Sequence, residues 1–204
     1  MSTRSERRAR RAPKRFGAAT IIPMGATIVL LAIIAAIAIV NRKAVGSSMP
    51  VPLSSNLSVG DSAPNFSVAT SQGQFSLAST TGPVLLEVFA TWCPHCQHET
   101  VVMNKLYAAY GDRVHFVAVS GSPLAMNHSS PESQADVDAF VQFFQVRYPV
   151  AFDQSLDVAN AYIQAGFPTI VLIGSDKRVK YLGTGEIAEA TLAHNIRSML
   201  ARRR

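Results

Sequence analysis

Cysteine is scarce in this sequence: the 204 residues contain two, Cys93 and Cys96. A disulfide between cysteines this close together closes too small a loop to restrain much of the unfolded chain, so a purely structural bridge is not favoured. Internal repeats are absent, and after residue 44 there is no basic face with interleaved aromatic residues. These absences favour one domain and argue against nucleic acid as a partner.

The net charge of +6 arises from the two ends of the chain. Residues 44–204 carry ten Lys or Arg against twelve Asp or Glu, so this part is slightly acidic. By contrast, seven Lys or Arg precede residue 16, and residues 16–41 contain no charged side chain. A helix rises about 1.5 Å per residue, so this apolar stretch is long enough to cross a hydrocarbon layer of about 30 Å. The pattern predicts a single transmembrane anchor at 16–41 in contact with the lipid bilayer.

A cleavable signal peptide is the alternative for this segment, but its apolar core is long and no small-x-small cleavage site follows it. Because Lys and Arg stay on the cytoplasmic side, we expect the N-terminus inside and the rest of the chain outside the plasma membrane. The Ser-, Pro- and Gly-rich residues after the anchor predict a tether. The predicted organisation is a basic cytoplasmic N-terminus (1–15), an anchor (16–41), a flexible linker (42–58) and one domain (59–204).

Beyond the linker, apolar periodicity alternates between strands and helices, which is typical of an α/β sandwich. The predicted strands are a short hairpin within 66–77, buried strands at 84–90 and 114–119, and shorter strands at 149–152, 169–173 and 179–183. The predicted helices cover 94–109, 135–146, 156–165 and 186–200, with a polar loop at 121–131.

The two cysteines lie where an apolar strand gives way to a helix. A helix N-terminus offers free N–H groups and partial positive charge, so Cys93 is predicted to be the attacking thiolate. Cys96, one turn inward, is the predicted resolving thiol. Pro94 suits the first helical turn because it has no N–H to satisfy, and His95 can add positive charge beside Cys93. The pattern predicts a redox-active dithiol that requires no metal or organic cofactor.

Two glutamates are candidates for the group that exchanges a proton with Cys96. Glu87 interrupts an apolar strand, where burial of a charge is costly unless the carboxyl is protonated or paired. The alternative for Glu87 is a strand-end residue turned toward water. Glu99 lies three residues after Cys96 on the same side of the helix and can serve instead, or it is an ordinary surface glutamate. The sequence does not choose between them.

These motifs resemble the thioredoxin superfamily and, more narrowly, the membrane-anchored TlpA/ResA-like thiol-disulfide oxidoreductases. The segments that carry the resemblance are Gly60–Phe66, Ala90–Cys96, Glu99 and Gly166–Thr169. The resemblance implies a thioredoxin-like three-layer α/β sandwich with an N-terminal β-hairpin extension, preceded by a single transmembrane helix. It also implies two kinds of partner, disulfide or dithiol client proteins and a membrane redox partner that resets the dithiol.

The resemblance assigns further residues to the site. Trp92 becomes a lid over the cysteines. Pro168 matches the cis-proline of the superfamily, which would place the Phe167 backbone beside the sulfurs to pair with an extended client segment. Glu87 falls at the buried-acid position of thioredoxins and Glu99 at an acid position of the ResA-like group.

Two departures from the family pattern concern the same helix. Val101 stands where many relatives have a helix-kinking proline. Pro94 and His95 form the dipeptide of the oxidant DsbA rather than the usual pair of a reductant, which leaves the direction of electron flow open.

Two other functions compete with this interpretation. A thiol peroxidase of the peroxiredoxin class shares the general fold and the type of segment at 148–153, but the P-x-x-x-T-x-x-C arrangement around its cysteine is absent. A module that binds or delivers copper or zinc is also possible, because thiolates suit these metals. Its candidate ligands are two thiols and three histidines: Cys93, Cys96, His95, His98 and His128.

Overall fold

The computed structural model describes Ile33 and residues 55–201. The chain divides into two compact units, Met1–Ser48 and Met49–Arg204. In the first unit only Ile33 is described, as an exposed helical residue. The predicted N-terminus (1–15), the remainder of the predicted anchor (16–41) and residues 42–54 lie outside the described residues. Among the residues that are described, no helix has the length and apolar character needed to cross a membrane.

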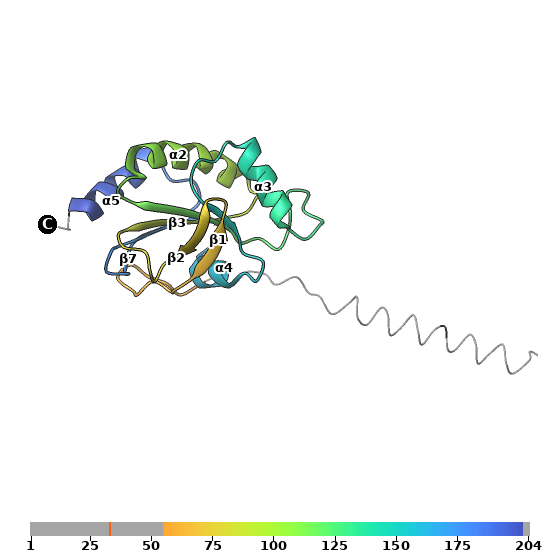
Figure 1. The fold of residues 1–204 in the computed structure, drawn as a ribbon, viewed down its shortest axis with the longest axis horizontal. Coiled ribbons are helices and arrows are strands. Elements are labelled where there is room, and N and C mark those ends of the chain that lie inside the picture. Colours follow the sequence, from red (N-terminus) through yellow and green to blue (C-terminus); the bar gives the residue numbers. More distant parts are fainter. Residues whose placement is uncertain (1–32, 34–54, 202–204) are drawn as a thin grey trace, which may run out of the picture. The chain divides into compact units, whose positions relative to one another are not determined.

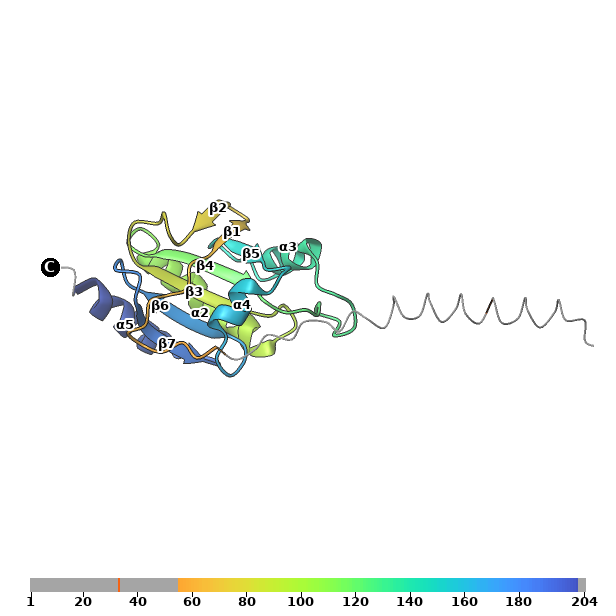
Figure 2. The same cartoon turned by 90° about the horizontal axis from the view of Figure 1, so that it is seen from below.

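A seven-stranded mixed sheet lies at the centre of the second unit (Figures 1 and 2). Its strands are β1 (Ser67–Thr70), β2 (Gly73–Ser76), β3 (Val84–Phe89), β4 (His115–Ser120), β5 (Val150–Phe152), β6 (Thr169–Ile173) and β7 (Val179–Thr184), in the order β2-β1-β5-β4-β3-β6-β7. Strands β3, β4 and β5 are parallel. The hairpin β1–β2 pairs antiparallel with β5, so it extends the sheet on one side as the sequence predicts.

Helices cover both faces of this sheet. They are α2 (Pro94–Tyr110), α3 (Gln134–Phe143), α4 (Asp157–Tyr162) and α5 (Glu189–Ala201). In Figure 1, α2, α3 and α5 lie above the sheet and α4 lies below it. The alternation along β3 explains this: Leu85 and Phe89 pack with side chains of α2, α3 and α5, whereas Leu86 and Val88 pack with side chains of α4. The expected three-layer α/β sandwich is therefore present.

Three helices differ in extent from the prediction. Helix α4 ends at Tyr162 instead of continuing to residue 165, because Ile163 turns into an extended conformation. Helix α3 ends at Phe143, since Gln145 takes up a left-handed conformation with φ of 51°. Helix α5 begins at Glu189, three residues later than predicted. By contrast, α2 runs without interruption through the exposed Val101, the position where many relatives carry proline.

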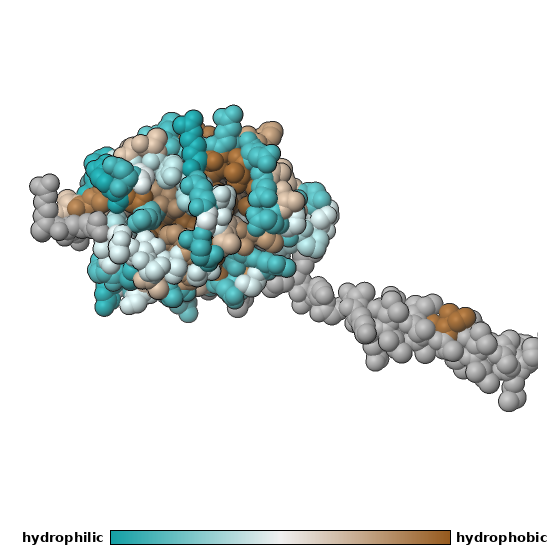
Figure 3. Space-filling model, in the orientation of Figure 1, coloured by the Kyte–Doolittle hydropathy of each residue, from teal (hydrophilic) through white to brown (hydrophobic). Residues whose placement is uncertain are grey.

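The packed part of the chain begins within the predicted linker. The backbone N–H of Ser55 donates to the carbonyl oxygen of Ile163 over 2.6 Å, and Leu57 packs against the core beneath the sheet. Polar side chains predominate on the surface shown in Figure 3. Among the described residues, the exposed large apolar side chains are Ile33, Val59, Val101, Met126 and Phe143.

Candidate active site

The two cysteines lie where β3 leads into α2. Cys93 is the N-cap of α2, with extended backbone angles, and Pro94 occupies the first helical turn. The backbone N–H of Cys96 donates to Cys93 Sγ over 3.4 Å, and the Cys93 thiol donates to the carbonyl oxygen of Phe167 over 3.7 Å. Both residues are unbridged thiols, with Cys93 4% exposed and Cys96 fully buried. The sulfur of Cys93 therefore lies at the surface end of the pair, and Cys96 is shielded behind it.

Burial keeps Cys96 in the thiol form. Removal from water raises the pKa of Cys96 well above its usual range, and the hydrogen bond to Cys93 and the charge of Glu87 add to the effect. A thiol must lose its proton before it can attack a disulfide. Cys96 therefore needs a nearby group that accepts this proton.

Glu87, one of the two candidates for this group, is buried rather than turned toward water. Its side chain comes from the middle of β3 and is 1% exposed. Tyr148 donates a hydrogen bond from its hydroxyl to Glu87 Oε2 over 3.3 Å, while Glu87 Oε1 has no partner. Burial raises the pKa of Glu87 to about 8; the charge of Glu99 acts in the same direction and the Tyr148 bond opposes it. The carboxyl can thus hold or release a proton near neutral pH.

Glu99 is also buried, on the same side of α2 as Cys96. It is 1% exposed, and Glu99 Oε2 accepts a hydrogen bond from the backbone N–H of Ile187 over 3.0 Å. Burial raises the pKa of Glu99 to about 7; the Ile187 bond opposes this and the charge of Glu186 adds to it. Its Oε1 atom has no partner. The site therefore contains two acids with incomplete hydrogen bonding, and the charge of Glu87 acts directly on Cys96.

Trp92, the residue predicted to be a lid, packs against Phe167, whose carbonyl oxygen lies beside the Cys93 sulfur. The Trp92 indole donates to Ser122 Oγ over 2.7 Å, and its ring packs edge-on against Phe167 with centroids 6.0 Å apart. His128 contacts the same indole at 5.0 Å. The peptide bond between Phe167 and Pro168 is cis. This arrangement leaves the Phe167 carbonyl beside Cys93, at the position that the resemblance assigns to client binding.

The candidate metal ligands do not converge. Nδ1 of His95 lies 2.6 Å from Glu186 Oε1 and Nδ1 of His98 lies 3.4 Å from the same oxygen, whereas His128 lies against Trp92. Within Ile33 and residues 55–201, no group of three or more His, Cys, Asp or Glu side chains is arranged to hold a metal ion. The structure therefore adds no support to the alternative of a copper or zinc module.

Sequence analysis missed three residues around the site. Tyr148 supplies the hydroxyl that bonds Glu87. Glu132 is buried at the end of the polar loop, where it accepts hydrogen bonds from Thr91 and Ser120 over 2.6 Å each. Glu186 binds the histidines. No local pattern identifies them, because each acts on a partner far away in the sequence.

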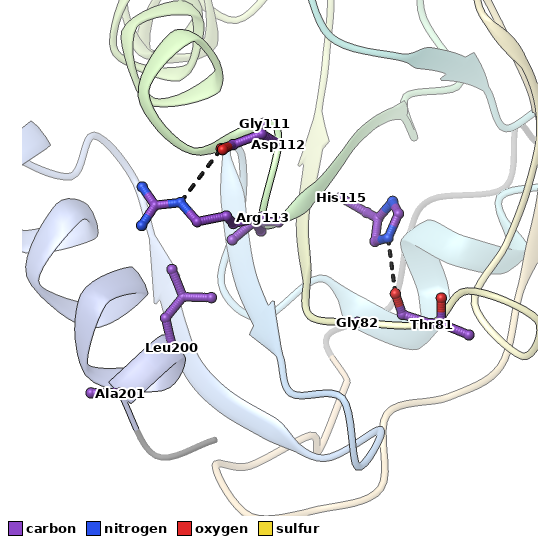
Figure 4. A pocket seen from close by; sticks show the side chains of 9 residues that line it. Thr81, Gly82, Gly111, Asp112, Arg113, His115, Leu200 and Ala201 are labelled. Atoms are coloured by element: carbon purple, nitrogen blue, oxygen red, sulfur yellow. Dashed lines mark hydrogen bonds and ion pairs between the residues drawn. The ribbon is translucent and has the colours of Figure 1, made fainter. Parts of the chain in front are cut away.

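A pocket of about 680 Å³ lies at the other end of α2 (Figure 4). Two of its side chains are already engaged: His115 bonds the Thr81 carbonyl oxygen over 3.1 Å, and Arg113 bonds Asp112 over 3.4 Å. Because Cys93 lies at the first turn of α2 and this pocket at its last turn, the pocket is separate from the dithiol.

A thioredoxin-like sandwich with two thiols at a helix start defines a protein that exchanges disulfides. A family model described as Redoxin matches residues 58–198. The thiol-disulfide oxidoreductase ResA of Geobacillus kaustophilus is 28% identical over 145 residues, which are 70% of this chain and 79% of that protein. ResA of Bacillus cereus is 30% identical over 126 residues, which are 60% of this chain and 68% of that protein. The chain therefore belongs to the Redoxin family and is a thiol-disulfide oxidoreductase of the TlpA/ResA-like group.

Solved structures agree with this assignment. A crystal structure from Chlorobium tepidum, of a protein assigned as thiol:disulfide interchange protein DsbE, is 26% identical with a TM-score of 0.62, covering 71% of this chain and 99% of that one. The crystal structure of StoA from Bacillus subtilis has a TM-score of 0.55 at 20% identity, and the match covers 66% of this chain and 97% of StoA. The second likeness concerns the fold alone.

Proposed function

We propose that this chain is a membrane-tethered thiol-disulfide oxidoreductase that reduces disulfides of client proteins outside the cytoplasmic membrane. The observation that carries the reductive direction is the ion pair of His95 with Glu186 over 2.6 Å. A cation free to stabilise the Cys93 thiolate would favour the reduced form of the dithiol. The Cys93–Cys96 disulfide would then take up electrons readily, and the protein would be an oxidant. Here the His95 imidazole has a carboxylate partner.

The first step is attack on the client. The Cys93 thiolate attacks one sulfur of the client disulfide, so that a Cys93–client disulfide forms and the client S–S bond breaks. The released client thiolate takes a proton from water. The Phe167 carbonyl, beside Cys93, and the cis-Pro168 that follows it offer an extended client segment a backbone to pair with.

The second step resolves this mixed disulfide. The Cys96 thiol passes its proton to the Glu87 carboxylate and its sulfur attacks Cys93 Sγ, which forms the Cys93–Cys96 disulfide and releases the second client thiolate. This thiolate takes a proton from water, and Glu87 returns the proton of Cys96 to water. The client has then gained two electrons and two protons, and the dithiol has lost them. A membrane-bound dithiol partner restores Cys93 and Cys96 by the reverse exchange.

The membrane tether rests on residues 16–41, which lack charge and follow a basic flank. A membrane-impermeant thiol reagent is therefore expected to label reduced Cys93 in intact cells, with Cys93→Ser as the unlabelled control. Labelling that appears only after lysis would contradict the outward orientation.

Trapping tests the exchange itself. In Cys96→Ser the mixed disulfide forms but is not resolved, so covalent adducts with client proteins should accumulate and disappear on treatment with a reductant. Cys93→Ser is the matched control, because it keeps one thiol but removes the attacking one. Equal adduct levels in the two variants would overturn the assignment of Cys93 as the nucleophile.

A further inference from the structure

Glu186 contacts the first turns of α2 although it belongs to the connection between β7 and α5. Its Oε1 atom lies 2.6 Å from Nδ1 of His95 and 3.4 Å from Nδ1 of His98. The histidine side chains are 67% and 75% exposed and that of Glu186 is 46% exposed. One carboxylate thus serves two imidazoles that flank the resolving cysteine in the sequence.

The backbone on either side of Glu186 is fixed to the active site. The N–H of Gly185 donates to the carbonyl oxygen of Pro168 over 2.8 Å. The N–H of Ile187 donates to the buried Glu99 carboxyl over 3.0 Å. Gly185 has a φ of 82°, a conformation that suits glycine. These two hydrogen bonds fix the backbone on both sides of Glu186, and so they hold its side chain beside the histidines.

The histidines engage this carboxylate, while the Cys93 sulfur has other contacts. Cys93 Sγ accepts from the Cys96 N–H and donates to the Phe167 carbonyl. The hydrogen bonds from His95 and then His98 hold the pKa of Glu186 below its ordinary value, so the carboxylate stays charged in mildly acidic solution. A protonated imidazole bound to a carboxylate presents little net charge to a thiolate nearby.

We propose that Glu186 is a positioning residue for disulfide exchange, which binds His95 and His98, offsets part of their positive charge and thereby keeps the Cys93–Cys96 dithiol a stronger reductant. The inference deepens the proposed function and rests on its reductive direction. It assigns Glu186 no contact with the client or the reacting sulfurs. Its effect reaches Cys93 through the two histidines.

The test is the equilibrium of Glu186→Gln with reduced and oxidised glutathione at about pH 6, where histidine is largely protonated. Without the carboxylate, the imidazolium charge favours the Cys93 thiolate and hence the reduced form. The equilibrium constant for oxidation of the dithiol should fall about threefold. For a two-electron couple this is a shift of about 14 mV toward a more oxidising potential. An unchanged constant would overturn the proposal.

Glu189→Gln is the matched control. Glu189 is 47% exposed and pairs with Lys105 over 3.2 Å, so its removal changes the charge by the same amount in the same region of the chain. Lys105 lies about three turns along α2 from Cys93, roughly 18 Å and beyond the screening length of about 8–10 Å. This variant should leave the glutathione equilibrium as in the unaltered protein. If Glu189→Gln shifted the equilibrium as much as Glu186→Gln, the change in net charge alone would explain both shifts, and the proposed role of the histidines would be overturned.

A double-mutant cycle distinguishes action through the histidines from direct action on the sulfur. In a His95→Gln, His98→Gln background, Glu186→Gln should shift the equilibrium no more than the Glu189 control. An undiminished shift in that background would show that the carboxylate acts on Cys93 by itself. Failure of the proposed function has a different signature: the unaltered protein would then have the potential of an oxidant, whether or not Glu186→Gln shifts it.

Discussion

Two buried acids, Glu87 and Glu132, differ in how completely their oxygens are bonded. Both Glu132 oxygens accept hydroxyl hydrogen bonds, from Thr91 and Ser120. Glu87 has a single bond, from Tyr148, and an oxygen without a partner. A buried polar group left unsatisfied costs stability, so it persists where it has a use. Glu132 thus holds the polar loop against the strand ends, while Glu87 keeps one oxygen without a partner, as the proposed proton transfer from Cys96 requires.

The largest expected effect comes from Glu87→Gln, which removes the proton acceptor and keeps the shape. Resolution of a Cys93 mixed disulfide by Cys96 should slow by about 100-fold, the lower range for loss of a general base. The free energy of unfolding should not fall, because an amide avoids the cost of a buried carboxylate. Stopped-flow release of a disulfide-linked model peptide measures the rate. An unchanged rate would remove Glu87 from the mechanism and leave Glu99 as the acceptor.

Glu132→Ala should show the opposite behaviour. The hydroxyls of Thr91 and Ser120 would lose their acceptor inside the protein, at a cost of about 2–3 kcal/mol in the free energy of unfolding. The resolution rate of the folded protein should stay close to that of the unaltered chain. Urea denaturation and the same peptide assay measure the two quantities. A variant that is stable but slow would mean that the two acids do not have separate roles.

The dependence of stability on pH should sharpen the contrast. In the folded protein the pKa values of Glu87 and Glu99 are raised from 4.5 to about 8 and about 7. Between pH 4.5 and the raised pKa values, the folded state holds protons that the unfolded state has lost. The stability that these two groups contribute is therefore fully present below pH 4.5 and is lost as the pH rises toward 8. The slope contributed by each group is at most about 1.4 kcal/mol per pH unit. In the reduced protein, Glu87→Gln should make the denaturation midpoint depend less on pH across this range. A slope unchanged by this substitution would show that Glu87 ionises normally.

The smallest expected effect concerns the cover over the cysteines. Ser122→Ala removes the acceptor of the indole of Trp92, which is half-buried and can bond water instead. The loss of stability should be about 0.5–1 kcal/mol. Because Trp92 is the single tryptophan of the chain, its fluorescence reports the change directly. An emission spectrum identical to that of the unaltered protein would show that the bond does not hold the ring.

Much of this architecture follows from local patterns in the sequence. The apolar run of β3 followed by Cys93, Pro94 and Cys96 predicts the strand, the helix start and the dithiol together. The hairpin, the central strands and α2 could be predicted because each has its own periodicity. The end of α4 could not, since Ile163 takes an extended conformation that the helical pattern does not predict.

The surroundings of the acids could not be read from the sequence. A single glutamate in an apolar strand fits either burial or a position facing water, and the structure buries Glu87. Glu132 bonds a residue 41 positions away and Glu186 one 91 positions away. Such contacts depend on how the strands and loops assemble, which local periodicity does not encode.

The reduction potential of the Cys93–Cys96 pair is the measurement that tests the account most directly. Equilibration with defined ratios of reduced and oxidised glutathione gives it in one titration. The account predicts a value near that of thioredoxin, about −270 mV. A value near that of DsbA, about −120 mV, would contradict the reductive direction and show that His95 stabilises the Cys93 thiolate despite its pairing with Glu186.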